Sequence, residues 1–99
     1  MKIDFAALEW EISASGLRSK SFETNGKRAR LLEHSSAARE EEWCEKPHVG
    51  YVLEGELEIE FFDKTETFRA GDGIFISAGE KHKARSPAEK TLLFLVEDI

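Results

Sequence analysis

Short stretches of alternating hydrophobic and polar residues run along most of the chain, and glycines separate them. After Gly55, for example, Leu57, Ile59 and Phe61 alternate with glutamates. A period of two is typical of a β-strand with one face in the core and the other in solvent. The pattern predicts strands over residues 17–24, 27–35, 50–54, 56–62, 65–68, 74–76, 82–85 and 91–96.

The helical signal is weak by comparison. Residues 35–45 are rich in Ala and Glu but have no apolar stripe at helical spacing, and Pro47 follows, so at most one turn of helix is expected there. Residues 92–96 are apolar on both faces, as in a strand that is covered on both sides. Many short antiparallel strands must hide their edges, and the sequence therefore predicts an all-β domain closed into a small barrel or a two-sheet jelly roll.

Length, charge and cysteine content narrow the class of protein. The 99 residues suit one domain, because two cores would each be too small. The net charge of -6 opposes binding to nucleic acid or to an anionic membrane surface. No apolar run is long enough to span a bilayer, and residues 1–10 carry no signal-peptide pattern. Cys44 is the single cysteine, which suits a reducing compartment, so a cytoplasmic location is expected.

Two glycine-bounded segments carry the most specific pattern. The first ends in the turn Tyr51-Val52-Leu53-Glu54-Gly55, and the second places Gly71, Gly79 and His82 at fixed spacing. Over residues 27–96 the chain resembles the cupin superfamily, in the form of small single-domain bacterial cupins. The resemblance implies a double-stranded β-helix, the jelly-roll cupin barrel, built around the motifs H-x-H-x(3,4)-E-x(6)-G and G-x(5)-P-x-G-x(2)-H-x(3)-N. Ser77 and Ser86 replace the proline and asparagine of the second motif.

The first motif departs from the family pattern at all three of its ligand positions. Counting back from Gly55 puts His48 at the position of the glutamate ligand, and the shorter spacer puts Cys44 and Glu42 at the positions of the two histidines. Each replacement is still able to bind a metal, as is His82 from the second motif. The resemblance thus implies a site made of Glu42, Cys44, His48 and His82 for a divalent first-row metal. Thiolate and imidazole favour zinc or iron, with manganese, nickel and copper as further options.

Other interpretations of these residues stay open. The longer spacer would move the first two positions to Glu41 and Trp43 and remove the thiolate. Cys44 alone also fits a small buried hydrophobe, and Glu42 a solvated acid. His34 has no place in either motif and is interpreted as structural.

Strand parity places the candidate pocket in the barrel interior. His48, Gly50 and Val52 share one parity, so His48 is expected to converge with His82, and Gly50 to leave space beside the imidazole. Residues 1–26 precede the conserved barrel at 27–96 and include strand-like alternation near Trp10. Such extensions commonly pair with a second protomer in small cupins, so the resemblance implies a homodimer.

Two functions fit this sequence. One is an enzyme in which a metal with open coordination positions acts on a small substrate. The alternative is a metal-free module that binds or senses a small ligand without catalysis. No substrate-specific pattern decides between them, and the expectation is a small cupin of unassigned activity.

Overall fold

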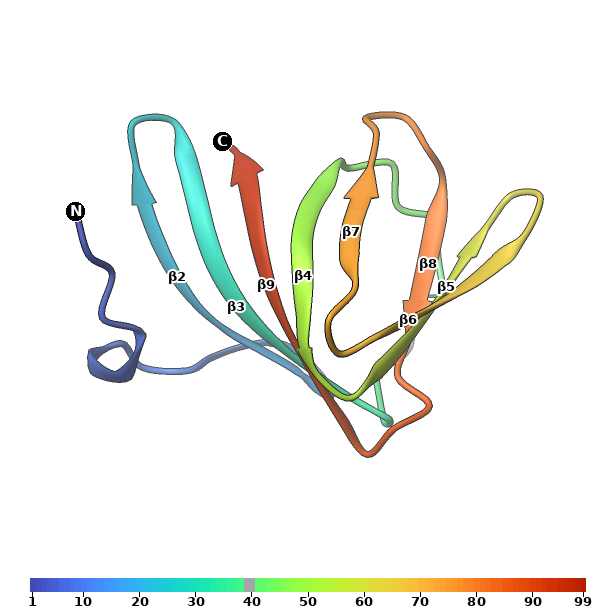
Figure 1. Cartoon of the computed structure of the whole chain (residues 1–99), viewed down its shortest axis with the longest axis horizontal. Helices are drawn as coiled ribbons and strands as arrows, with labels where there is room; N and C mark the ends of the chain where they lie inside the picture. Colours follow the sequence, from blue (N-terminus) through green and yellow to red (C-terminus); the bar gives the residue numbers. More distant parts are fainter. Residues whose placement is uncertain (39–40) are drawn as a thin grey trace.

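The computed structural model describes residues 1–38 and 41–99. In these residues, nine strands form two antiparallel sheets that face each other (Figure 1). A six-stranded sheet has the order β1-β2-β3-β9-β4-β7, and a three-stranded sheet has the order β6-β5-β8. The strands are β1 (Glu11–Ala14), β2 (Leu17–Thr24), β3 (Lys27–Ser35), β4 (His48–Glu54), β5 (Glu56–Phe61), β6 (Thr65–Arg69), β7 (Gly73–Ile76), β8 (His82–Arg85) and β9 (Lys90–Asp98).

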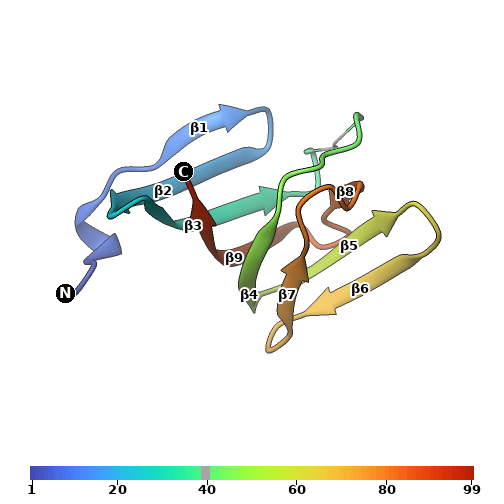
Figure 2. The same ribbon diagram turned by 90° about the horizontal axis from the view of Figure 1, so that it is seen from above.

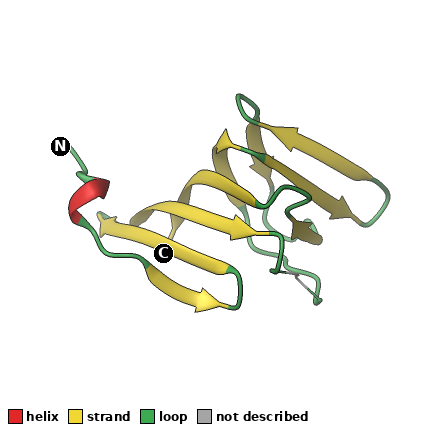
Figure 3. Ribbon diagram, turned by 90° about the horizontal axis from the view of Figure 1, so that it is seen from below, coloured by secondary structure: helices red, strands yellow, loops and turns green. Residues whose placement is uncertain are grey.

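The predicted all-β jelly roll is confirmed. β2 and β3 have the predicted bounds, and the turn between them contains Asn25 and Gly26, both with positive φ. Figure 3 shows strands and loops throughout, apart from the short 3-10 turn η1 (Phe5–Ala7). Residues 35–38 and 41–45 contain no helix, and the remainder of that stretch, residues 39–40, lies outside the described part of the chain. Among the described residues, no helix has the length and apolar character needed to cross a membrane.

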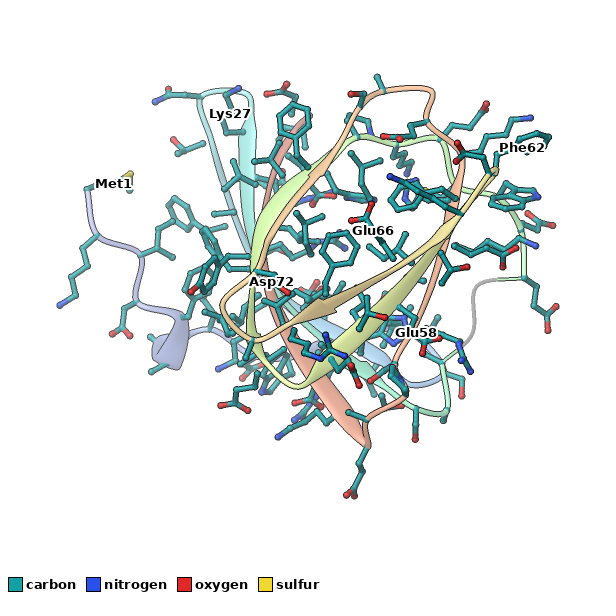
Figure 4. All side chains as sticks on the ribbon, turned by 45° about the vertical axis from the view of Figure 1, so that its right-hand side comes forward. Met1, Lys27, Glu58, Phe62, Glu66 and Asp72 are labelled. Carbon is teal, nitrogen blue, oxygen red and sulfur yellow. The ribbon has the colours of Figure 1, made fainter. Side chains whose placement is uncertain are left out.

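The core lies between the two sheets. As predicted, Leu57, Ile59 and Phe61 of β5 are buried, while Glu56 and Glu58 point outward and pair with arginines on the neighbouring strands. Leu57 and its neighbours pack against residues from the six-stranded sheet in one cluster. The cluster consists of Val52, Leu57, Ile59, Phe61, Phe68, Ile74, Ile76, Leu93 and Leu95. The hairpin that joins β5 to β6 extends beyond this core, and Phe62 projects from its tip (Figure 4).

The outer face of β9 differs from the expectation. Residues 92–96 are apolar on both faces, but only the inner face of this strand is fully buried. Phe94 on the outer face contacts the ring of Phe5 at 6.1 Å between centroids, whereas Val96 is 39% exposed. The prediction of full cover on both sides is wrong, because η1 covers only part of the outer face.

The N-terminal segment packs on its own sheet. β1 pairs antiparallel with β2, and Lys20 donates a hydrogen bond to the carbonyl oxygen of Phe5 at 3.0 Å. Viewed from above, β1 forms the edge of the six-stranded sheet next to β2 (Figure 2). The segment therefore extends the sheet within one chain.

The two sheets join where β4 continues into β5. Gly55 makes this corner with φ +83, and a Cβ atom there would lie 2.5 Å from the carbonyl oxygen of Lys90. Thr91, fully buried beside the corner, donates to the carbonyl oxygen of Glu56 at 2.6 Å and accepts the Glu56 N–H at 3.1 Å. Its hydroxyl also lies 2.8 Å from the hydroxyl of Ser86. We call Thr91, Ser86 and the Glu56 backbone the corner cluster.

Candidate metal site

Three of the predicted ligands meet inside the molecule. One donor atom from each of Cys44, His48 and His82 lies within 4.8 Å of the other two. The imidazole rings of His48 and His82 are 5.2 Å apart between centroids and nearly perpendicular. His48 begins β4 in the six-stranded sheet and His82 begins β8 in the three-stranded sheet. The site therefore lies where the two sheets face each other, as the strand parity predicted.

Cys44 reaches the site through an isolated β-bridge. Its backbone N–H donates to the carbonyl oxygen of His82 at 2.9 Å, and the His82 N–H donates back to the Cys44 carbonyl oxygen at 3.0 Å. The two residues are directly opposite in this antiparallel pairing, which brings their side chains to the same face. The bridge thus fixes the thiol beside His82 without a longer strand.

Contacts outside the site orient both imidazoles. His82 is 2% exposed, and its Nδ1 donates to the carbonyl oxygen of Glu80 at 2.8 Å. Nδ1 of His48 lies 3.4 Å from Oε2 of Glu97, an ion-pair distance without a well-aligned hydrogen bond. With both Nδ1 atoms directed away, the Nε2 atoms are the nitrogens left for a metal. Outer partners of this kind are typical of histidine ligands.

Glu42, the fourth predicted ligand, is not brought to this group. Its side chain is exposed and is not among the residues that line the cavity described below. The prediction assumed strand alternation from residue 42 to residue 44, but residues 41–47 form no strand and Cys44 lies in an isolated bridge. Glu41 and Trp43, the residues of the longer spacer, also lie outside the group, and Lys83 covers the Trp43 ring.

Gly50 has a different role from the one expected. A Cβ atom at this position would lie 2.1 Å from the carbonyl oxygen of Phe94 and 2.6 Å from a methyl carbon of Leu95. Both atoms belong to β9, which pairs with β4 here. The glycine is therefore required for the close approach of two strands rather than for space beside the imidazole.

The three candidate ligands line a cavity of about 300 Å³ between the sheets. A volume of this size is in the range that small-molecule sites occupy. Sequence reasoning missed several polar residues of its wall, which are Arg28, Arg30, His34, Lys46 and Glu97. Arg28, Arg30 and His34 of β3 have the same strand parity as Leu32. This alternation was the signal in the sequence that could have placed them on the inner face. The register of β3 against β9, which pairs Arg28 with Glu97, has no local signature.

His34 is buried in the cavity wall with one nitrogen unpaired. Its Nδ1 donates to the Ser35 carbonyl oxygen at 3.2 Å, and its Nε2 has no hydrogen-bond partner among the described residues. Burial lowers the pKa of His34 from its ordinary value of 6.5, so the ring is neutral near pH 7. The interpretation of His34 as purely structural therefore omits its place in the cavity.

Among the described residues, Glu97 is the only carboxylate that lines this cavity. Its Oε1 accepts from Arg28 at 3.2 Å and its Oε2 accepts from Arg30 at 3.0 Å. Burial alone would raise the pKa of Glu97, but the nearby His48, Arg30 and Arg28 outweigh burial and lower the pKa to about 2. Glu97 therefore stays ionised and holds two guanidinium groups at the edge of the site.

The sequence profile of the Cupin_2 family of cupin domains matches residues 33–96, which include Cys44, His48 and His82. The chain belongs to this cupin family. Its nine strands in two facing sheets are the cupin jelly roll, and the matched range runs from β3 to β9. The resemblance of the two motifs is thereby confirmed.

Solved structures share the cupin fold. A protein of unknown function from Rhizobium leguminosarum has 24% identity and a TM-score of 0.80, covering 97% of this chain and 93% of that one. A cupin-2 domain protein from Shewanella frigidimarina has 26% identity and a TM-score of 0.70, covering 82% and 79%. KdgF from Halomonas sp. has 20% identity and a TM-score of 0.76, covering 89% and 83%. No curated protein matches the chain.

Proposed function

We propose that this cupin binds a divalent first-row metal through Cys44, His48 and His82, and a small molecule next to it in the cavity. The observation that carries the proposal is the approach of the three donor atoms to within 4.8 Å of one another. The burial of His82, the partial burial of Cys44 and His48, and the outward direction of both Nδ1 atoms support it.

The donor set fits zinc or iron. A thiolate and two neutral imidazoles are ligands that these metals accept, while oxygen-preferring cations such as magnesium are disfavoured. Three protein ligands leave coordination positions for water or for an oxygen of a bound molecule. A metal held in this way supplies Lewis acidity. Catalysis and a cytoplasmic location stay predictions, and the unpaired thiol of Cys44 fits a reducing compartment.

Metal retention tests the proposal. The protein is stripped with chelator, incubated separately with Zn, Fe, Mn, Ni and Cu, desalted and subjected to elemental analysis. We expect about one ion per chain and a higher melting temperature with metal, since binding to the native state stabilises it. Cys44→Ser and His82→Ala should lose the metal, whereas Glu42→Gln, the matched control, should keep it. If no metal is retained by the wild type, the proposal fails in favour of the metal-free binding module.

We also propose the homodimer that the family resemblance implies, through the outer face of the six-stranded sheet. Val49, Phe75 and Val96 lie side by side there on paired strands, and each is exposed. A self-complementary apolar face is typical of two-fold dimers. Light scattering should give a dimer mass for the wild type and a monomer mass for Phe75→Glu. The control Phe62→Glu, at the exposed hairpin tip, should stay dimeric; a monomeric wild type would contradict the proposal.

A further inference from the structure

We propose that the cavity binds a small molecule that carries a carboxylate or phosphate group, and that Arg30 holds this group beside the metal site. The inference rests on the proposed function in one respect, that the cavity is the ligand site. It specifies the charge of the bound small molecule, which Cys44, His48 and His82 alone do not determine.

The charge of the cavity wall is opposite to that of the chain. The charged residues in the wall are Arg28, Arg30 and Lys46 against the single carboxylate of Glu97. Three cationic side chains against one carboxylate give the wall an excess of positive charge, although the whole chain has a net charge of -6. Positive charge collected in a concave site of an acidic protein favours an anion over a neutral or cationic molecule.

The two guanidinium groups have more donors than Glu97 is able to accept. Each arginine carries five N–H donors, while one carboxylate offers about four acceptor sites. Both arginines share this one carboxylate. Nε of Arg30 is buried and has no hydrogen-bond partner among the described residues. Buried donors are normally paired, so this atom marks a place where a bound acceptor is expected.

Arg30 is also positioned close to His48, one of the three proposed metal ligands. Oε2 of Glu97 lies 3.0 Å from Nη2 of Arg30 and 3.4 Å from Nδ1 of His48. One carboxylate oxygen therefore separates the guanidinium from an imidazole of the metal site. A ligand with an oxyanion on Arg30 would place its neighbouring atoms next to the metal ligands, and guanidinium forks suit both carboxylate and phosphate.

Two pairs of small molecules test the charge preference. Lactate is compared with lactamide, and glycerol 3-phosphate with glycerol, by NMR titration that follows the Nε–H signal of Arg30. Each titration is run on metal-loaded and metal-free protein. We expect the anion of at least one pair to bind about tenfold more tightly than its neutral partner and to shift the Arg30 signal, as a charge-assisted hydrogen bond would. Tight binding of lactate alone would identify the anion as a carboxylate, and tight binding of glycerol 3-phosphate alone would identify it as a phosphate. Binding of both would mean that the site accepts either group.

Variants that should change anion affinity in opposite directions distinguish an effect on binding from damage to the fold. Arg30→Gln should weaken anion binding about tenfold, and Arg30→Lys, which keeps the charge but not the fork, should weaken it less. Glu97→Gln replaces the competing carboxylate by a neutral amide, a weaker acceptor for the two arginines, and should tighten anion binding, a gain that misfolding does not produce. Arg18→Gln removes the same charge from an Arg–Glu pair outside the cavity and should leave binding unchanged.

The inference is overturned if neither anion binds better than its neutral partner, or if Arg30→Gln and Arg18→Gln behave alike. Metal content measured on the same samples distinguishes the two proposals. Retained metal without anion preference refutes this inference alone, and anion binding to protein that retains no metal refutes the metal site alone.

Discussion

The two buried polar clusters of this cupin differ in how completely their hydrogen bonds are satisfied. In the corner cluster, Thr91 donates to and accepts from the backbone of Glu56 and contacts the hydroxyl of Ser86. In the cavity wall, Nε of Arg30 and Nε2 of His34 are buried without a hydrogen-bond partner among the described residues. Both clusters lie between the same two sheets, so burial alone does not explain the difference.

The contrast separates structural polar groups from groups available for binding. A buried polar atom with its partners in place stabilises one arrangement of the chain. A buried atom without a partner costs free energy until a ligand supplies one. The corner cluster is therefore expected to affect stability and not binding, and the cavity wall to affect binding more than stability.

The largest effect is expected at the metal ligands. In metal-loaded protein, His48→Ala or His82→Ala should lower metal affinity by about a hundredfold or more, because three ligands are reduced to two. The freed thiol of Cys44 should then react faster with a thiol reagent, measured as a labelling rate. Equal and slow labelling in the wild type and both variants would indicate that Cys44 is a packed core residue.

Substitution in the corner cluster should change stability alone. Thr91→Val keeps the shape of the side chain but leaves the N–H and carbonyl of Glu56 without their partner, so the free energy of unfolding should fall by about 2 kcal/mol. Urea denaturation measures this change, and metal content should stay the same. Thr67→Val, an identical change at an exposed position of β6, is the control. A loss of metal in Thr91→Val would remove the distinction between the two clusters.

The smallest effect concerns His34, which has one paired and one unpaired nitrogen. Because burial lowers the pKa of His34 below 6.5, the unfolded chain takes up a proton at a higher pH than the folded chain does. Stability from the neutral ring is complete above pH 6.5 and is lost as the pH falls toward the lowered pKa. Metal-free His34→Asn should lose less stability than the wild type between pH 8 and pH 5 in urea denaturation. An equal loss would mean that His34 does not titrate differently on folding.

Local patterns predicted much of the fold and part of the site. The alternation in β5 gave the correct inner and outer faces, and the Asn25-Gly26 turn fixed the bounds of β2 and β3. The motif spacing brought His48 and His82 together because both motifs are defined by strand parity around glycine turns.

The parts that were missed depend on pairing between distant strands. Arg28 and Arg30 reach the cavity and Glu97 only through the register of β3 with β9, and Gly50 is needed because β9 approaches β4 closely. Glu42 was assigned by extending strand alternation into a segment that forms an isolated bridge at Cys44 and no strand. Each of these features is a relation between segments far apart in the chain, which the local pattern of residues does not encode.

The single bridge between Cys44 and His82 also makes the site observable by hydrogen exchange. Its two amide protons are held by one reciprocal pair of hydrogen bonds, and on the Cys44 side the described residues add only the bond from the Gly79 N–H to the Glu45 carbonyl oxygen. Amides protected by so small a unit exchange through local opening rather than through global unfolding. A metal ion bound by the side chains of the same two residues would make this local opening less frequent. The exchange rates of these two amides would then report occupancy of the site directly, while amides in the centre of β9 would change little.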